Sequence, residues 1–241
     1  MKEEIKKAKE LIEKSEKIVI LTGAGVSAES GIPTFRGSQG LWNNFNVEEL
    51  ATLRGFLKNP KLVWQWYNER RKNILNSKPN LAHLKLAQLE KIKPNTWIIT
   101  QNVDGLHYKA GSKNVIEFHG NIFSEKCLTC DYSRKQEVYY EDSDLPLLCP
   151  RCGNLLRPDV VWFEEPIAPE NIEKSFELVK ECDLFMFIGT SAVVYPAAYL
   201  IELALKQEKQ IIEINLEPTY YTGLFEITLL GKASHLLDEI I

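Results

Sequence analysis

The sequence has no long apolar run, no excess of basic residues and no apolar segment at its start. Its apolar stretches, such as residues 18–21 and 184–188, are far shorter than the roughly 18 residues that cross a bilayer. A formal net charge of −4 gives no general positive field for DNA or an acidic membrane, so neither is an expected partner. The chain begins Met-Lys-Glu-Glu rather than with the apolar core of a signal peptide, which predicts a cytoplasmic protein.

Internal repeats, low-complexity tracts and long linkers are also missing from the 241 residues. This length suits one large domain, or a large domain that carries a small insert. In a reducing compartment structural disulfides are rare, so the five cysteines are better considered as metal ligands or buried apolar residues.

Short apolar runs rich in β-branched residues predict buried strands at residues 18–21, 97–100, 115–118, 184–188 and 210–215. Helical periodicity occurs at residues 2–16, 80–91, 169–181 and 195–207. This alternation predicts an α/β fold with a mostly parallel sheet covered on both faces. Residues 41–79, mainly helical, and residues 121–158, polar and rich in cysteine, interrupt it, and we interpret them as inserts that form a smaller lobe.

Four cysteines form two CxxC pairs, Cys127 with Cys130 and, after 18 residues, Cys149 with Cys152. This spacing is typical of a zinc ribbon, and four thiolates leave no open position for water, so the single metal would be structural. A redox pair and plain turn cysteines are the alternatives. A zinc ribbon that binds nucleic acid is disfavoured by the many acids of the segment. Cys182 has no partner and is interpreted as a buried apolar residue.

A glycine-rich loop follows the first predicted strand, with Gly23, Gly25 and Ala28 in a G-x-G-x-x-A pattern. Such a loop lets backbone N–H groups approach a pyrophosphate, although a plain turn explains the pattern alone equally well. A hydride-transferring dehydrogenase fits poorly. Its fold expects a second strand and an acid about 20 residues further on, whereas this chain continues into a helical stretch.

Taken together, the motifs resemble the sirtuins in the order of that family, over about residues 17–235. They are GAGVSAESGIPTFRG at 23–37, TQNVDGLH at 100–107, FHG at 118–120, the cysteine quartet, GTS at 189–191 and the strand end at 215–217. The resemblance implies a Rossmann-like NAD-binding domain of residues 1–40, 80–120 and 159–241. It implies a small lobe made of the helical insert 41–79 and the zinc-ribbon insert 121–158.

The resemblance also implies the roles of individual residues. His119 matches the general base, whereas His107 is expected to be structural and His83 and His235 carry no signal. The expected cofactor-binding residues are Gly23, Ala24, Gly25, Ser27, Thr34, Phe35, Arg36, Trp42, Gln101, Asn102, Asp104, Gly189, Thr190, Ser191, Asn215, Glu217 and Ala233.

An acyl-lysine protein or peptide is the implied partner, gripped as an added strand by Val161, Trp162, Phe163, Val194 and Tyr195. The chain departs from the family pattern at Glu164, where the sirtuin sequence usually has glycine. This change puts the peptide preference in doubt but not the chemistry.

Tyr67 and Arg70 lie three residues apart in a helical stretch, so both side chains can reach one pocket. Arginine and tyrosine suit a carboxylate, and the spacing resembles the sirtuin subgroup that removes succinyl and malonyl groups. On charge alone, a packed Tyr67 and a solvated Arg70 are the simpler interpretation.

The implied activity is NAD-dependent removal of acyl groups from lysine side chains, with NAD consumed to give nicotinamide and O-acyl-ADP-ribose. Two alternatives stay open. One is mono-ADP-ribosyl transfer, which uses the same activated ribose. The other is a non-catalytic zinc-ribbon and nucleotide-binding module, which the combination of His119, Asn102 and Asp104 disfavours.

Overall fold

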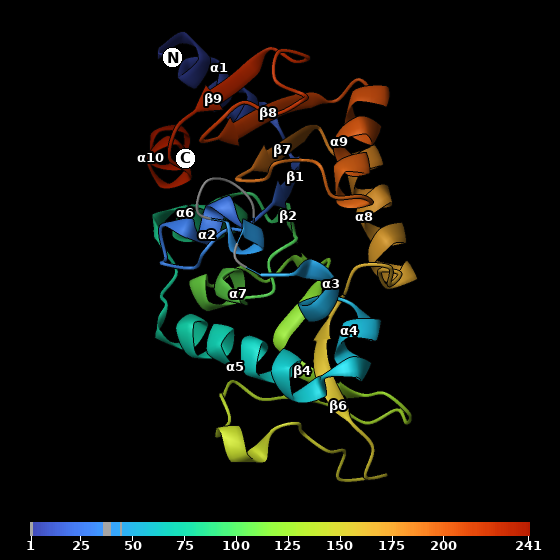
Figure 1. Ribbon diagram of the computed structural model, residues 1–241. Coiled ribbons are helices and arrows are strands. Elements are labelled where there is room, and N and C mark those ends of the chain that lie inside the picture. Colours follow the sequence, from blue (N-terminus) through green and yellow to red (C-terminus); the bar gives the residue numbers. More distant parts are fainter. Residues whose placement is uncertain (1, 36–39, 44) are drawn as a thin grey trace.

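The computed structural model describes residues 2–35, 40–43 and 45–241, without the side chain of Trp42. The chain builds one six-stranded sheet and a separate three-stranded sheet, which lie at opposite ends of the molecule in Figure 1. Within the described residues, no helix is both long and apolar enough to cross a membrane.

The large sheet is parallel throughout, as the alternating pattern predicts. Its strands run in the order β3 (Val115–Glu117), β2 (Asn95–Thr100), β1 (Lys17–Thr22), β7 (Leu184–Ile188), β8 (Gln210–Asn215) and β9 (Ile227–Leu230). The central strands are buried on both faces, which explains why their sequences are continuous apolar runs rather than alternating ones.

Helices cover both faces of this sheet. The helices α1 (Lys2–Lys14), α6 (Leu81–Ile92) and α10 (Ala233–Ile240) pack on one face, and α8 (Pro169–Glu181) and α9 (Ala197–Lys206) pack on the other (Figure 1). This confirms the predicted fold class, an α/β parallel-sheet domain of Rossmann type.

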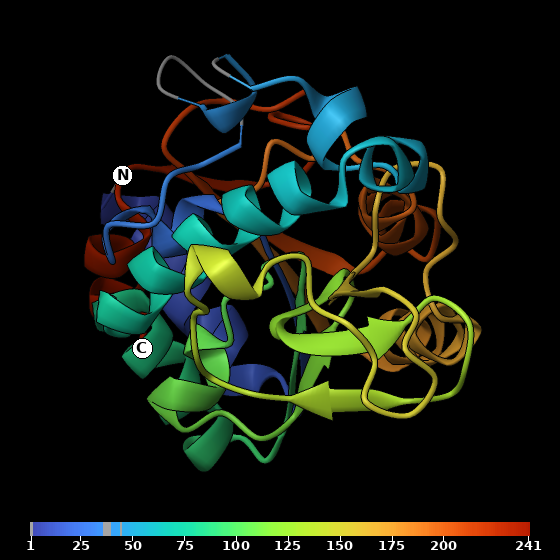
Figure 2. The ribbon, with the colours of Figure 1, turned by 60° about the horizontal axis from the view of Figure 1, so that its bottom comes forward.

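The two inserts pack together around an apolar core of their own. They contain α3 (Val47–Leu50), α4 (Leu53–Lys58) and α5 (Pro60–Asn76), together with the three-stranded sheet of β4 (Gly120–Cys127), β5 (Ser133–Lys135) and β6 (Leu156–Val160). Short 3₁₀ turns occur at η1 (Leu41–Asn43) and η2 (Asp142–Asp144). Figure 2 shows α5 lying across this sheet, which supports the proposal that the inserts form one smaller lobe.

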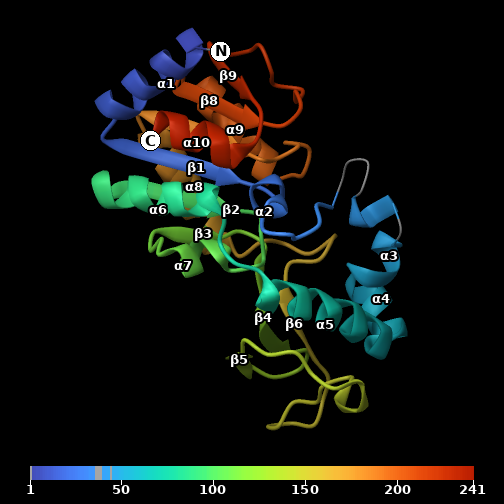
Figure 3. The ribbon, with the colours of Figure 1, turned by 90° about the vertical axis from the view of Figure 1, so that its left-hand side faces the viewer.

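A buried ion pair joins α5 to β4, two elements of this lobe that lie side by side in Figure 3. The Arg71 guanidinium donates to the Glu125 carboxylate over 2.7 Å and to the Ile122 carbonyl over 2.8 Å, and neither charged side chain is exposed. Arg134 and the Tyr140 hydroxyl also contact Glu125. A buried charge needs such compensation, so the pair fixes where α5 lies.

The predicted boundaries are close but the short elements were missed. The first helix ends at Lys14 rather than residue 16, and the helix predicted from residue 195 begins at Ala197 after Pro196. The sequence pattern did not identify α2 (Gly25–Ala28), α7 (Leu106–Ala110), β9 or α10. Three of these have only four or five residues, too few to show a hydrophobic period, whereas α10 has eight.

Glu164 occupies a backbone conformation that favours glycine. The Glu165 N–H donates to the Trp162 carbonyl over 3.1 Å and closes a four-residue turn, in which Glu164 has φ of 71°. A positive φ at this third position suits glycine and costs any residue with a Cβ atom roughly 1–2 kcal/mol. The glycine of the sirtuin pattern therefore has a steric reason, which Glu164 violates.

We expect Glu164→Gly to raise the free energy of unfolding by about 0.5–1 kcal/mol, since relief of the strained φ is partly offset by the extra entropy of glycine in the unfolded chain. Glu164→Ala is the matched control, because it removes the charge but keeps the Cβ atom. Urea unfolding of the zinc-loaded proteins measures both changes. Equal stabilisation by glycine and alanine would show that charge, not backbone strain, is the cause.

Candidate functional site

The predicted site residues gather where β1, β2, β7 and β8 end. Register pairs Thr22 with Thr100 and with Ile188, and Ile188 with Ile214, so the four strands finish at one edge of the sheet. Open α/β sheets bind ligands at this carboxyl edge, where loops leave in different directions.

The loops after β1 and β7 pack against each other without room for side chains. The Gly25 N–H donates to the Gly189 carbonyl over 2.8 Å. A Cβ atom on Gly23 or Gly25 would lie 2.8 Å or less from the backbone or side-chain atoms of Gly189 and Thr190, and Gly189 itself has φ of 60°. The glycines thus let the two loops converge at the sheet edge, which is where folds of this type bind a dinucleotide.

A buried hydrogen-bond network lies beneath the glycine loop. Asp104 accepts from the Ser27 hydroxyl over 2.7 Å and from the Leu106 N–H over 2.9 Å. Asn102 donates its side-chain amide to the Gly23 carbonyl and to the Ser27 hydroxyl. Burial raises the pKa of Asp104, and the two hydrogen bonds that it accepts oppose that shift.

His83 completes this network, although no recognised motif marks it. Its Nδ1 accepts from the Asn80 N–H over 3.3 Å, so its other nitrogen carries the proton and donates to Ser27 over 3.3 Å. Burial lowers the pKa of His83 to about 4, so the ring is neutral near pH 7. The Asn80-x-x-His83 spacing at a helix start, that of a capping box, was the signal that could have drawn attention to it.

A cavity adjoins these groups, between the glycine loop and α5. Residues from the glycine loop, the helical insert and the sheet edge line it, namely Ala24, Ser27, Ile32, Pro33, Phe35, Arg70, Ile74, Asn102, Val103 and Asp104. Thr34 lies beside it and accepts the Leu41 N–H through its carbonyl. Two predicted positions cannot be placed, because Arg36 and the side chain of Trp42 lie outside the described residues.

His119 directly follows β3 and Phe118, and its ring is held at the same sheet edge. The Nδ1 atom lies 3.2 Å from the Gln101 carbonyl. A carbonyl only accepts, so Nδ1 must be protonated and the lone pair of the neutral ring is on Nε2. Burial lowers the pKa of His119 despite this hydrogen bond, so the imidazole is a free base near pH 7.

The strand ends of β7 and β8 are joined to Gln101 by side chains. The Gln101 amide donates to the Thr190 hydroxyl over 3.0 Å, and Asn215 accepts from the Thr190 N–H over 2.9 Å. Ser191 and Glu217 are exposed at this edge. Ala233 starts α10 shortly after β9, whose Leu230 pairs with Asn215, and it belongs to the core cluster that contains Val26 of α2.

Arg70 faces the cavity and is surrounded by aromatic rings. Its guanidinium carbon lies 4.7 Å from the ring centre of Trp66, 4.9 Å from Phe35 and 5.5 Å from Tyr67. Within the described part of the chain no carboxylate forms an ion pair with it. Burial lowers the pKa of Arg70, and the Coulombic attraction of Tyr67 and Asp104 opposes this shift only in part.

Tyr67 does not line the cavity. It is 3% exposed, and its hydroxyl accepts from the Trp162 indole over 2.9 Å. The Tyr67 ring packs in the aromatic cluster, as the simpler interpretation held, and also contacts Arg70, which is partly buried rather than solvated.

The predicted peptide-binding segments differ in exposure. Val161 is partly buried and its N–H donates to the His119 carbonyl, whereas Trp162 is 2% exposed and supports the segment from within. Phe163 is 41% exposed and its N–H donates to Ala51. Val194 is partly buried and Tyr195 exposed, with the Tyr195 hydroxyl contacting Glu202.

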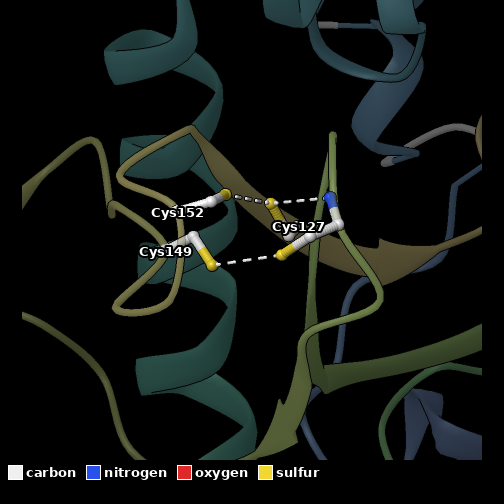
Figure 4. A group of neighbouring side chains, drawn as sticks. Cys127, Cys149 and Cys152 are labelled. Atoms are coloured by element: carbon white, nitrogen blue, oxygen red, sulfur yellow. Dashed lines mark hydrogen bonds between the residues drawn. The ribbon is translucent and has the colours of Figure 1, made fainter.

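The four cysteines of the small lobe converge, and Figure 4 shows the second CxxC pair facing Cys127. The sulfurs of Cys127 and Cys152 are 3.5 Å apart and those of Cys130 and Cys149 are 3.6 Å apart. Sulfurs bound to one tetrahedral zinc lie roughly 3.8 Å apart, whereas a disulfide needs about 2.05 Å. The quartet therefore fits one structural zinc ion, while Cys182 is buried at a distance as a small apolar residue.

Comparison with known proteins gives one consistent result. The family model described as "Sir2 family" matches residues 23–196. The NAD-dependent protein deacylase of Pyrococcus furiosus is 48% identical over 240 residues, covering 96% of this chain and 94% of the relative.

Solved structures agree. A Sir2 homologue–NAD complex is 45% identical with a TM-score of 0.92, covering 98% of this chain and 91% of the other. A complex described as Sir2, p53 peptide and NAD+ is 32% identical with a TM-score of 0.86, covering 98% and 96%.

We expect one zinc ion per chain, and we expect Cys149→Ser to lose it and to unfold the small lobe, since metal binding and folding of such a segment are coupled. Cys182→Ser is the control, because it also removes a buried sulfur but outside the quartet. Elemental analysis and proteolysis of the small lobe measure the two effects. Zinc-free native wild type, or zinc loss in the control, would contradict the assignment.

Proposed function

The chain belongs to the Sir2 family and is an NAD-dependent protein deacylase, and we propose that its substrates include lysines carrying acyl groups that end in a carboxylate. The observation that supports this is the partly buried Arg70 guanidinium, which borders the cavity and forms no ion pair within the described residues. The relatives' names support the deacylase activity, and the complex with a p53 peptide supports a protein or peptide as the acceptor.

The carboxyl edge of the sheet suits NAD, because open α/β sheets bind ligands where loops leave the strand ends, and the glycines let the loops after β1 and β7 meet there. Bound there, NAD supplies a ribose whose nicotinamide can leave and whose hydroxyls can receive the acyl group. Asn102 and Asp104 border the same cavity, and each forms a hydrogen bond with the Ser27 hydroxyl. These bonds fix the two side chains in positions from which they orient the ribose and the carboxamide.

We propose that His119 is the general base at the edge of this space. Its Nδ1 proton is committed to the Gln101 carbonyl, so Nε2 is the atom that accepts a proton from a ribose hydroxyl. The lowered pKa keeps the ring neutral at physiological pH, so no proton must leave before it acts. Phe35, which borders the cavity, excludes water from the reacting face.

Arg70 determines which acyl chains enter. The three rings around it, from Trp66, Phe35 and Tyr67, accept the cation and an alkyl chain but offer no negative charge to neutralise it. A succinyl or malonyl carboxylate would satisfy the guanidinium by paired hydrogen bonds. Tyr67 contributes through packing, because its hydroxyl is already engaged with Trp162 and its pKa is raised by burial.

We expect His119→Ala to lose at least 10²-fold in kcat for every acyl peptide, while thermal stability and NAD binding are largely kept, because a positioned base contributes about that factor. In the wild type, kcat/KM should fall on the acid side only below pH 6.5. The lowered pKa means that the ring protonates, and loses its lone pair, later than an exposed histidine as the pH falls. An acid limb centred above pH 6.5, or turnover near wild type in the variant, would contradict the role.

We expect Arg70→Met to lower kcat/KM for succinyl-lysine peptides by roughly 10²-fold or more, since a carboxylate buried without its partner costs several kcal/mol. Deacetylation should change less than about threefold, because an acetyl group has no charge to satisfy. Matched peptides that differ only in the acyl group measure both values.

Two controls accompany this substitution. Arg70→Lys keeps the charge but not the planar fork, so it should retain part of the desuccinylation. Lys72→Met removes a charge from the exposed side of the same helix and should leave both activities unchanged. Equal loss of both activities in Arg70→Met would show that Arg70 supports the lobe and does not select the acyl chain.

A further inference from the structure

An ionisable side chain lies buried behind the carboxyl edge, at a position that no motif marks. Glu213 in β8 is 0% exposed. No lysine, arginine or histidine in the described part of the chain forms an ion pair with it. Four neutral groups donate to its carboxylate instead, from Asn215 (3.0 Å), Thr219 (2.8 Å), Thr222 (2.7 Å) and Thr228 (3.4 Å). A buried carboxylate without a cation is costly, so this cluster calls for an explanation.

Three of the donors belong to the strand end and the loop that follows it. The Asn215 amide donates to Oε1, and the hydroxyls of Thr219 and Thr222 donate to Oε1 and Oε2. Thr219 and Thr222 also close a turn, because the Thr219 N–H donates to the Thr222 hydroxyl over 2.8 Å. One carboxylate thus fixes the course of residues 215–222 where they leave the sheet.

The orientation of the Asn215 amide follows from this arrangement. A carboxylate can only accept, so the NH₂ group of Asn215 must face Glu213 and its carbonyl oxygen must face the other way. That oxygen accepts from the Thr190 N–H, and the Thr190 hydroxyl accepts from the side-chain amide of Gln101. The backbone carbonyl of Gln101 in turn accepts from His119 Nδ1. A continuous hydrogen-bonded chain therefore runs from Glu213 across the ends of β8, β7 and β2.

We propose that Glu213 is a positioning residue for the cofactor site, one that fixes the Asn215 amide and the 219–222 turn before NAD binds. The inference rests on the proposed function, because it assumes that the ends of β7 and β8 contact NAD. Glu213 itself is buried and acts through Asn215 and Thr190. The advantage is preorganisation, since the strand-end groups do not have to be ordered when the cofactor arrives.

The effect of a substitution at position 213 should therefore depend on whether the new side chain can accept hydrogen bonds. Glutamine keeps one carbonyl oxygen for Asn215 and Thr219, and the Thr222 hydroxyl can rotate to accept from its amide. Leucine has similar volume but no acceptor, so the Asn215 amide and three hydroxyls would lose their partner and the amide would be free to flip.

The test uses the full-length, zinc-loaded protein and ADP-ribose, the part of NAD that remains without nicotinamide. Calorimetry gives the dissociation constant for ADP-ribose, and steady-state assays give KM for NAD and kcat. We expect Glu213→Leu to weaken ADP-ribose binding and raise KM for NAD by at least tenfold, with kcat at saturating NAD changed less than about threefold. Glu213→Gln should stay within about threefold of wild type in every value.

Two further variants separate positioning from folding. Ile211→Ala lies on the same strand and makes a cavity in the core, so it should lower the melting temperature without changing ADP-ribose binding. If Glu213→Leu does not fold, Thr222→Val removes one donor and leaves the carboxylate in place. It should still weaken ADP-ribose binding about threefold.

The outcomes are distinct. A folded Glu213→Leu that binds ADP-ribose as tightly as wild type would overturn the proposal. If Glu213→Leu does not fold, a Thr222→Val variant that binds ADP-ribose as tightly as wild type would also overturn it. A Glu213→Gln variant as impaired as Glu213→Leu would overturn it too, because the negative charge and not the acceptor would then be the cause. A wild type that does not bind ADP-ribose would instead contradict the proposed NAD-dependent function and leave all variants alike.

Discussion

The parallel alignment of β2, β1, β7 and β8 is the constraint on which the predicted site depends. Because the four strands run in the same direction and their paired residues end together at Thr100, Thr22 and Ile188, the loops that follow them must share one edge. Glycine then decides how closely those loops approach. The contact of Gly25 with Gly189 is only possible without a Cβ atom, so the space left for a ligand is set by backbone atoms that cannot move aside.

Two adjacent arginines of α5 have different roles in joining the small lobe to this edge. Arg71 faces into the lobe and pairs with Glu125 on β4, two residues before Cys127, so the anchor of the helix and one of the four zinc-site cysteines lie on one strand. Arg70, the preceding residue, points about 100° away around the helix axis and faces the cavity. Two adjacent arginines thus have different environments. The ion pair of Arg71 with Glu125 fixes the position of α5, and thereby the position of Arg70 at the cavity.

Much of this organisation could be predicted from residue patterns, and the remainder could not for identifiable reasons. Continuous apolar runs gave five of the strands because central parallel strands are buried on both faces. The spacing of the cysteines predicted their convergence because the geometry of one metal ion demands it. His83 was missed because its role depends on contacts with Ser27 and Asn80, which no local pattern shows. Tyr67 and Arg70 share a helical spacing, yet only contacts with Trp162 showed that the hydroxyl turns away from the cavity.

Glu213 illustrates the same limit from the other side. An acid inside an apolar strand reads as an exposed position of a half-buried strand, and only the structure shows that it is covered by hydroxyls. Its carboxylate accepts only from neutral donors, while Arg70 and Asp104 border the cavity and do not form an ion pair with each other in the described residues. Under the proposed function, Glu213 is satisfied within the protein, whereas Arg70 binds the ligand. That contrast separates groups that shape the site from groups that recognise what enters it.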